Sequence, residues 1–594
     1  MSDRWPAPAD VLRRWAVLVP VAALLVLAWQ RRWVADDAFI NFRVLDQLGA
    51  GNGPVYNRGD RVEVATSPLW LAVVGLAHLV TRVPLEWLSV VISMAMAAAA
   101  LVVATVGARR LLAGEDDDEG TWWVPLGAVV FVAVPAAWDW TTGGLENGLS
   151  WLWLASSFTA VTTAVRDPRR ATLVRGLVVV GLGVLVRPDF GPYSLVWGAV
   201  LLYLGWRRLG VRPTALALAA GLALPVGGQL FRMGYYGQLL PNTVYAKEGG
   251  RSWWGQGWRY LVDFAGTYGL VVPLVVVGVI VVVAAGERRR DLGWRLVVGA
   301  TVVAALAHAV LVVKAGGDYM HARLLLAPWF ALLLPAAAVP WRPAGRRAGA
   351  VLGAGLALVA LWAGVAGTTL RVGPPIFEDR VFDARAFEIG RGTHAHPITV
   401  EDHLAYLTVS PEERRRRASV PGWHPVGAFD EQALPVAPGL DPDRSYYPVT
   451  AAGAAAYGVP TDVYVIDLLG LADRLAARVE LPRRRVPGHE KWLRGAWHAA
   501  RWVDPDTPVD PGLNLIAPVL LVDGDTQTPL EDAPFRAERE AARRALACGE
   551  LPALVASSTE PLTVGRVVAN LGDALTLERY RFPEDPIEAE RELC

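Results

Sequence analysis

Long apolar stretches with few charged residues fill most of the first 370 positions of this 594-residue chain, and they constrain its fold more than any other feature. A transmembrane helix needs roughly 20 apolar residues to cross the hydrocarbon core of a bilayer. About 11 stretches approach this length, counting polar ends that can reach the interface. They cover 14–34, 85–110, 122–138, 147–165, 172–187, 191–206, 213–231, 267–285, 294–313, 322–340 and 347–370. The pattern predicts a polytopic α-helical membrane protein.

Residues after 370 differ, because their polarity is ordinary for a soluble protein. We expect a transmembrane domain over 1–370 and a mixed α/β soluble domain over 371–594, with a helix at 533–547. The apolar run at 68–80 is shorter than a span and is expected to lie at the interface or to enter the membrane partway. The first stretch lacks a small-residue cleavage site, which favours a retained span.

Arginine-rich loops set the expected orientation, since Lys and Arg concentrate on the cytoplasmic side of membrane proteins. With about 11 spans, all the basic loops fall on one side. The C-terminal domain then lies outside the plasma membrane, together with the first loop at 35–84. The basic loops are 13–14, 109–110, 166–170, 207–208, 288–290 and 342–347.

The charge balance, the cysteines and the histidines limit the possible functions. Lys and Arg total 57, as do Asp and Glu, and the resulting zero net charge argues against a nucleic-acid partner. Cys548 and Cys594 both fall in the part expected outside, where a disulfide is expected and two free thiols are the alternative. His394, His396 and His403 only weakly resemble metal-ligand spacing, so neither a metal ion nor a cofactor is indicated.

Acids, bases and aromatic residues gather in the loops of the outer face. Asp36 and Asp37 directly follow the first span, and an adjacent acidic pair at a membrane boundary is costly to desolvate. Convergence of such groups on one face predicts a functional site there. The other candidates are Glu63, Glu146, Asp189, Arg232, Tyr235, Lys247, Asp318, His321 and Arg323.

These residue types suit a lipid-linked sugar. Cations and aromatic groups would bind its phosphate, and these are Arg232, Tyr235, Lys247, His321 and Arg323. Carboxylates would bind sugar hydroxyls, and these are Glu63, Glu146, Asp189 and Asp318. An acceptor hydroxyl also needs a general base, for which Asp36 is the first candidate and Asp37 the second. Sugar nucleotides are not expected outside the plasma membrane, so the donor would be a sugar on a polyprenyl phosphate.

Each of these residues also has a purely structural interpretation. The Asp36–Asp37 pair could cap the following helix. Arg232 and Arg323 could anchor the protein at the interface, and Tyr235 could belong to an aromatic belt.

Several motifs resemble those of a known family. The acidic pair, followed by Gly51-Asn52-Gly53-Pro54 and Thr66-Ser67-Pro68, is similar to the first extracytoplasmic loop of bacterial type C glycosyltransferases. A larger ordered set resembles the mycobacterial terminal β-(1→2)-arabinofuranosyltransferases. It comprises Trp29 to Trp33, Thr142 to Glu146, Arg187-Pro188-Asp189, Phe231 to Gly237, Gly316 to His321, His394 to Pro397, Val465 to Leu471 and Gly488 to Lys491. Cys548 and Cys594 also lie where that family has cysteines.

The resemblance implies a type C (GT-C) transmembrane fold with a C-terminal extracytoplasmic domain. It also implies an enzyme of cell-wall assembly that uses decaprenyl-phosphoryl-arabinofuranose and caps the arabinan of arabinogalactan and lipoarabinomannan. The expected partners are membrane lipids, the lipid-linked donor and the arabinan acceptor. The first-loop aspartate would be the catalytic carboxylate. A β-linked donor giving a β-linked product implies net retention, through either a covalent intermediate or same-face attack.

Two other functions remain open from the residues alone. Another polyprenyl-phosphate-dependent enzyme could move mannose or a modifying sugar with the same set of groups. A lipid or sugar transporter is less favoured, because transporters often show internal repeats and midplane charges, whereas here the polar residues lie at one face.

Overall fold

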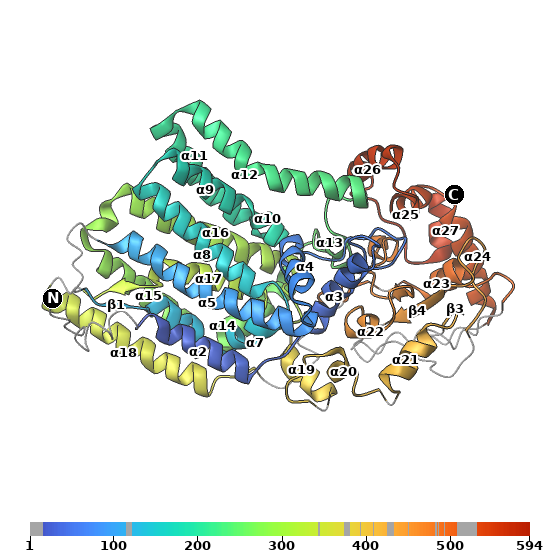
Figure 1. Ribbon diagram of the computed structural model, residues 1–594, viewed down its shortest axis with the longest axis horizontal. Coiled ribbons are helices and arrows are strands. Elements are labelled where there is room, and N and C mark those ends of the chain that lie inside the picture. The colour runs from blue at the N-terminus through green and yellow to red at the C-terminus, as the bar shows by residue number, and fades with distance from the viewer. Residues whose placement is uncertain are drawn as a thin grey trace.

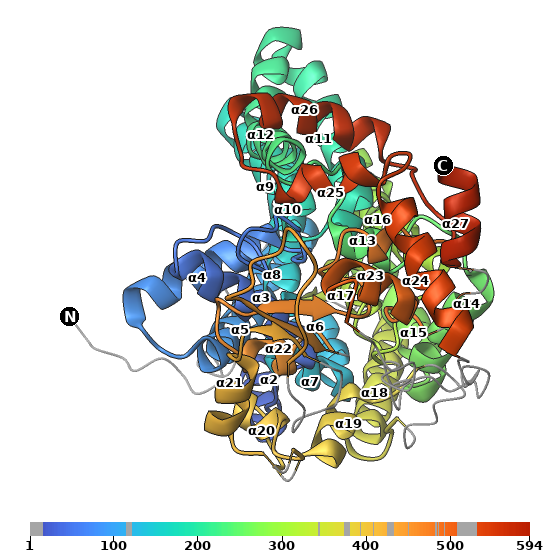
Figure 2. The ribbon, with the colours of Figure 1, turned by 90° about the vertical axis from the view of Figure 1, so that its right-hand side faces the viewer.

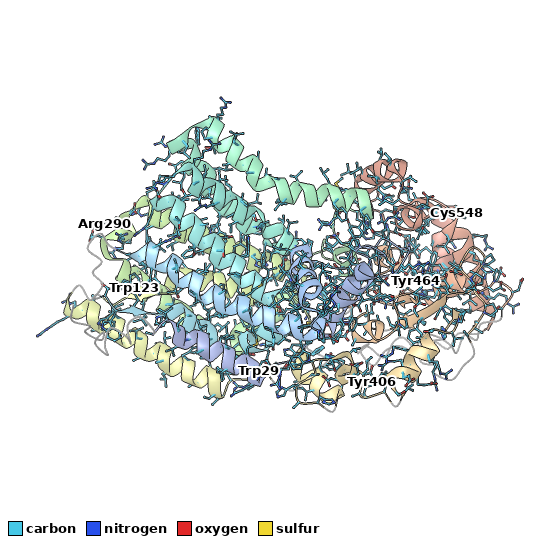
Figure 3. The ribbon with its side chains drawn as sticks, in the orientation of Figure 1. Trp29, Trp123, Arg290, Tyr406, Tyr464 and Cys548 are labelled. Carbon is cyan, nitrogen blue, oxygen red and sulfur yellow. A yellow bond between two sulfur atoms is a disulfide. The ribbon has the colours of Figure 1, made fainter. Side chains whose placement is uncertain are left out.

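The computed structural model describes residues 16–113, 121–341, 345–372, 381–392, 394–407, 409–424, 433–449, 451–481, 484, 486–491, 493–507 and 532–594. The predicted basic segments at 13–14 and 342–344 lie outside these ranges. Helices of the first 370 residues form an elongated bundle, and the later residues pack at one end of it (Figure 1). Arg290 lies at the opposite end of the bundle from this C-terminal part (Figure 3).

Within the described residues, five helices are long and apolar enough to cross a membrane. They are α5 (Leu85–Leu112), α12 (Val211–Phe231) with its π-helical continuation η2 (Arg232–Tyr236), α15 (Val271–Ala285), α16 (Leu292–Ala315) and α18 (Arg346–Thr368). The chain is therefore a helical membrane protein. Other bundle helices are α2 (Leu18–Gln30), α8 (Asn147–Arg166) and α11 (Gly191–Leu209).

Three predicted stretches are divided between two elements each. Residues 122–138 contribute to α6 (Leu126–Val132) and α7 (Pro135–Thr142), and 172–187 to α9 (Arg170–Gly181) and α10 (Gly183–Val186). Residues 322–340 hold α17 (Leu326–Leu333) and the 3-10 helix η4 (Leu334–Ala336). Pro135 starts a new helix because proline suits a first helical turn.

Two of the predicted loops are largely helical. Asp139 to Thr142 form the end of α7, where Arg31 at the end of α2 pairs with Asp139 through hydrogen bonds of 2.7 and 2.9 Å. Helix α7 therefore continues past residue 138, where the predicted span ends, and a partly buried ion pair fixes Asp139 within it. The 232–266 stretch holds η2, α13 (Asn242–Ala246) and most of α14 (Trp254–Thr267).

The segment that follows the first apolar helix contains two helices of 14 residues each. These are α3 (Asp36–Gly49) and α4 (Pro68–Thr81). The Ser67 side chain caps α4 by accepting the N–H of Trp70, and Pro68 occupies its first turn. At 1.5 Å per residue α4 is about 21 Å long, which is too short to span a bilayer.

A small parallel sheet forms the centre of the C-terminal part, in the order β3 (Gly422–Trp423), β4 (Ser445–Val449), β5 (Tyr464–Asp467). The surrounding helices are α19 (Ala384–Arg391), α20 (Val400–His403), α21 (Pro411–Ala418), α22 (Ala454–Tyr457), α23 (Gly495–Trp502), α24 (Asp532–Leu546), α25 (Leu551–Thr559), α26 (Val564–Thr576) and α27 (Pro586–Leu593). Helix α24 agrees with the helix predicted at 533–547. A disulfide joins Cys548, after α24, to Cys594 at the end of α27.

The C-terminal part is attached to the bundle through α3. Arg43 of α3 is 1% exposed and donates hydrogen bonds to the carbonyls of Ala456, Val459 and Val463. A second attachment lies at the end of α12, where Asn570 of α26 donates to the carbonyl of Gly234 at 3.0 Å. Figures 1 and 2 both show α26 beside the end of α12. These contacts fix the C-terminal part over the acidic pair.

Candidate active site

Asp36 is the first residue of α3 and lies directly against the C-terminal part. Its Oδ1 accepts the backbone N–H of Ala454 at 3.0 Å. Gly453 approaches so closely that a Cβ there would lie 2.2 Å from both the carbonyl oxygen and Oδ2 of Asp36. No ion pair to Asp36 occurs within the described ranges, so its carboxylate is held by a backbone amide and not by a cation.

Asp37, by contrast, lies among cations. Arg323 Nη1 is 3.1 Å from Asp37 Oδ2, and Lys247 Nζ is 3.8 Å from the same oxygen. The Tyr319 hydroxyl donates to Oδ1 at 3.5 Å. Arg323 Nη1 also lies 3.5 Å from Asp318 Oδ2. Two acids and two bases that are far apart in sequence thus form one cluster.

Electrostatics keeps this cluster charged. Burial opposes ionisation of Asp37, but the nearby Lys247 and Arg323 outweigh it, so the pKa of this carboxyl is lowered from its ordinary value. Burial lowers the pKa of the neighbouring His489, which is therefore neutral at pH 7. Among the residues that the structure describes, Arg323 Nε is buried and has no hydrogen-bond partner. An unsatisfied guanidinium N–H at the end of a buried charge cluster is suited to bind an anionic ligand.

Glu146 and Asp189 belong to a second cluster. Arg187 donates to Glu146 and, at 2.9 Å, to Asp189 Oδ1, while His308 Nε2 lies 3.0 Å from Asp189 Oδ2. These two of the four predicted sugar-binding carboxylates are therefore already paired with a partly buried arginine.

The remaining predicted residues lie in separate contacts. Arg232 forms a buried pair with Glu63, at 2.5 and 3.1 Å. Tyr235 stacks on Phe231, with ring centroids 5.0 Å apart. His321 Nδ1 lies 2.5 Å from Asp263 Oδ2.

The structure brings only some of the predicted phosphate-binding residues together. Lys247 and Arg323 contact the same carboxylate of Asp37, whereas Arg232 pairs with Glu63 and His321 contacts Asp263. The buried charge of Arg232 is stabilised by the opposite charge of Glu63, so Arg232 already has a local partner.

A cavity opens beside Asp36, between α3 and α19. We call it the α3–α19 cavity, and it encloses about 700 Å³ including its opening to solvent. Its lining residues include Trp33, Asp36, Tyr319, Phe387, Glu388 and Arg391. Carboxyl groups, a guanidinium and aromatic rings are the groups expected to bind a sugar.

Sequence reasoning missed Tyr319, His489 and Glu388 as candidates. Tyr319 lies within the motif Gly316 to His321, and His489 lies within the motif Gly488 to Lys491. The family resemblance of these motifs was the signal that could have identified both residues. Glu388 lies in an ordinary amphipathic helix, and no local pattern distinguishes it. Across the described parts of the chain, no three His, Cys, Asp or Glu residues are arranged to hold a metal ion.

Two curated proteins are similar to this chain over nearly its whole length. One is the terminal β-(1→2)-arabinofuranosyltransferase of Mycobacterium tuberculosis, 31% identical over 96% of this chain and 96% of the relative. The other carries the same name in Corynebacterium glutamicum and is 30% identical over 94% of this chain and 84% of the relative. No family model matches the chain.

Proposed function

The chain belongs to the family of terminal β-(1→2)-arabinofuranosyltransferases, and we propose that it transfers arabinofuranose to the arabinan of the cell wall, forming terminal β-(1→2) linkages. The observation that carries this proposal is the similarity to two relatives of that name over more than nine tenths of the chain. The charge cluster beside an aromatic, carboxyl-lined cavity supports a sugar-transfer site.

The proposed donor is decaprenyl-phosphoryl-arabinofuranose. Lys247 and Arg323 are the cations nearest the acidic pair, and Arg323 Nε is a free donor. A phosphate bound by these groups would gain roughly 1.5–3 kcal/mol per charge-assisted hydrogen bond. Asp37 and Asp318 would hold both cations in place while the donor is absent.

Asp36 is the proposed catalytic carboxylate. It has no cationic partner within the described ranges and lines the α3–α19 cavity, so it can approach a sugar carbon there. In a double displacement its Oδ would attack C1 as the phosphate leaves, and the acceptor 2-hydroxyl would then displace the carboxylate from C1 while giving its proton to the departed phosphate. In same-face attack it would stabilise the positive charge on the sugar while the departing phosphate takes the hydroxyl proton.

For topology, we propose a GT-C fold with about 11 spans, a transmembrane domain over 1–370 and a C-terminal domain over 371–594. The protein would lie in the plasma membrane with its site facing the periplasm. The position of Arg290 at the opposite end from the C-terminal part supports this orientation (Figure 3). Labelling of single cysteines introduced at Arg290 and at exposed Tyr406 in whole cells tests it, since only the Tyr406 position should react with a membrane-impermeant reagent.

The activity is tested with the full chain in proteoliposomes, radiolabelled decaprenyl-phosphoryl-arabinofuranose and a linear arabinofuranosyl oligosaccharide, followed by linkage analysis. New terminal β-(1→2) arabinofuranose is the expected product. The Asp36→Asn variant should lose about 10²- to 10⁴-fold in rate. Asp46→Asn, on the same helix, is the matched control and should stay active. Transfer of mannose in place of arabinofuranose, or donor movement without an acceptor, would contradict the proposal.

A further inference from the structure

Glu388 places a second carboxyl group in the α3–α19 cavity. It lies on α19, whose first turn is capped by Asp383 accepting the N–H of Ala386 at 2.9 Å. Its side chain is only 8% exposed and lines the cavity together with Asp36. Burying a carboxyl group without hydrogen-bond partners costs free energy, so a ligand that binds in the cavity is expected to supply such partners.

The carboxyl group of Glu388 is not satisfied by its neighbours. Its nearest charged partner is Arg391, whose Nη1 lies 4.0 Å from Oε1, beyond hydrogen-bond distance. Arg391 itself donates to the hydroxyl of Tyr406 at 2.8 Å. No residue that the structure describes forms a hydrogen bond with the Glu388 carboxyl, so its hydrogen-bonding capacity is directed into the cavity.

The protonation state of Glu388 suits binding of a neutral sugar. Burial and then the negative charge of Asp36 raise the pKa of Glu388 to about 8, against the weaker effect of Arg391. At pH 7 the group is therefore mostly protonated and can both donate and accept a hydrogen bond. The titratable groups that face it are Asp36 and Asp37 from α3, Tyr319 after α16, Arg391 from α19, and His489.

We propose that Glu388 is an acceptor-binding residue: its carboxyl group hydrogen-bonds to a hydroxyl of the terminal furanose of the arabinan chain, and so holds the neighbouring 2-hydroxyl beside Asp36. This inference rests on the function proposed above. Trp33, Tyr319 and Phe387 provide aromatic surface for the apolar faces of the furanose ring. The donor phosphate remains at Lys247 and Arg323, the cations that contact Asp37.

Steady-state kinetics of the full chain in proteoliposomes tests the assignment, with donor and oligosaccharide acceptor varied separately. Glu388→Ala should raise the acceptor KM at least about tenfold and leave the donor KM within about twofold. In Glu388→Gln the amide side chain can still donate and accept hydrogen bonds and has nearly the same shape as the protonated carboxyl group. Its KM for the oligosaccharide acceptor at pH 7 should therefore be close to that of the wild-type chain. Glu401→Gln, an exposed residue of α20, is the matched control and should change neither KM.

The pH profile gives a second, independent measurement. The acceptor KM of the wild-type chain should rise as pH increases through about 8, because the carboxyl then loses its proton, and Glu388→Gln should abolish that rise. An unchanged acceptor KM in Glu388→Ala, or a pH profile that Glu388→Gln does not alter, would overturn the assignment. A wild-type chain that transfers no arabinofuranose under these conditions would instead refute the proposed function itself.

Discussion

The carboxylate of Asp36 accepts the backbone N–H of Ala454 at 3.0 Å, although the two residues are 418 positions apart in the chain. Asp36 opens α3, at the end of the helical bundle, and Ala454 opens α22 in the C-terminal part. This contact makes the position of the proposed catalytic carboxylate depend on both parts of the protein. Changes in the segment before α22 should therefore alter the site without touching a substrate.

Gly453→Ala is expected to reduce transfer by about tenfold or more, a size typical of a displaced catalytic group. The added Cβ would lie 2.2 Å from Asp36 Oδ2, so either Asp36 or the 453–454 backbone must move. The rate with saturating donor and acceptor is the measurement. Gly390→Ala on α19, where a Cβ meets no atom within 4 Å, is the matched control. Full activity of Gly453→Ala would show that the close contact is not needed.

Arg323→Lys should raise the donor KM by about tenfold and leave the acceptor KM unchanged. Lysine keeps the positive charge facing Asp37 and Asp318 but lacks the Nε donor that Arg323 leaves unpaired. A melting temperature close to that of the wild type would show that the charge cluster still folds. If the donor KM does not change, the phosphate does not bind at this arginine.

Arg232→Ala is expected to destabilise the protein more than it weakens donor binding. Arg232 and Glu63 are buried together, and removing one partner of a buried ion pair costs about 3–5 kcal/mol. The double variant Arg232→Met with Glu63→Met should recover part of that loss, since it leaves no unpaired charge. Thermal unfolding of the wild-type chain and of these two variants in detergent measures this. A tenfold loss of donor affinity at unchanged stability would instead restore Arg232 to the phosphate site predicted from the sequence.

The Cys548–Cys594 disulfide should stabilise the C-terminal part without contributing to the chemistry. It closes a loop with a sequence separation of 46 residues, for which the chain-entropy model gives about 4 kcal/mol, less any strain. Cys548→Ser with Cys594→Ser should lower the melting temperature while the initial rate at low temperature stays close to the wild-type value. Two alkylatable thiols in unreduced native protein would show that the bridge does not form in solution.

Local patterns predicted several features well. The apolar stretches contain the membrane-length helices, and the acidic pair opens a helix at the end of the bundle as its position suggested. Lys247, Asp318 and Arg323 stand out in the sequence as polar residues near predicted spans, and in the structure they meet around Asp37. These successes share a cause, since a charged residue near the membrane needs a partner or a function, and that requirement is visible in the sequence.

The acid with which each arginine forms an ion pair could not be predicted in the same way. Arg232 and Arg323 are the same residue type and each lies at the end of a predicted span, yet one pairs with Glu63 and the other with Asp37. In the sequence, Glu388 is an ordinary polar position of a short amphipathic helix. Only its burial beside Asp36 raises its pKa and places it in the cavity.

The sequence by itself determined that this chain is a helical membrane protein, where its polar residues collect, and which family it resembles. These follow from hydrophobic length and residue type, which act locally along the chain. The tertiary structure alone decided that Asp36 is held by Ala454 while Asp37 is held by cations, and that α19 closes a cavity over the pair. Those contacts join residues hundreds of positions apart, and their energies depend on distance and burial in the folded protein.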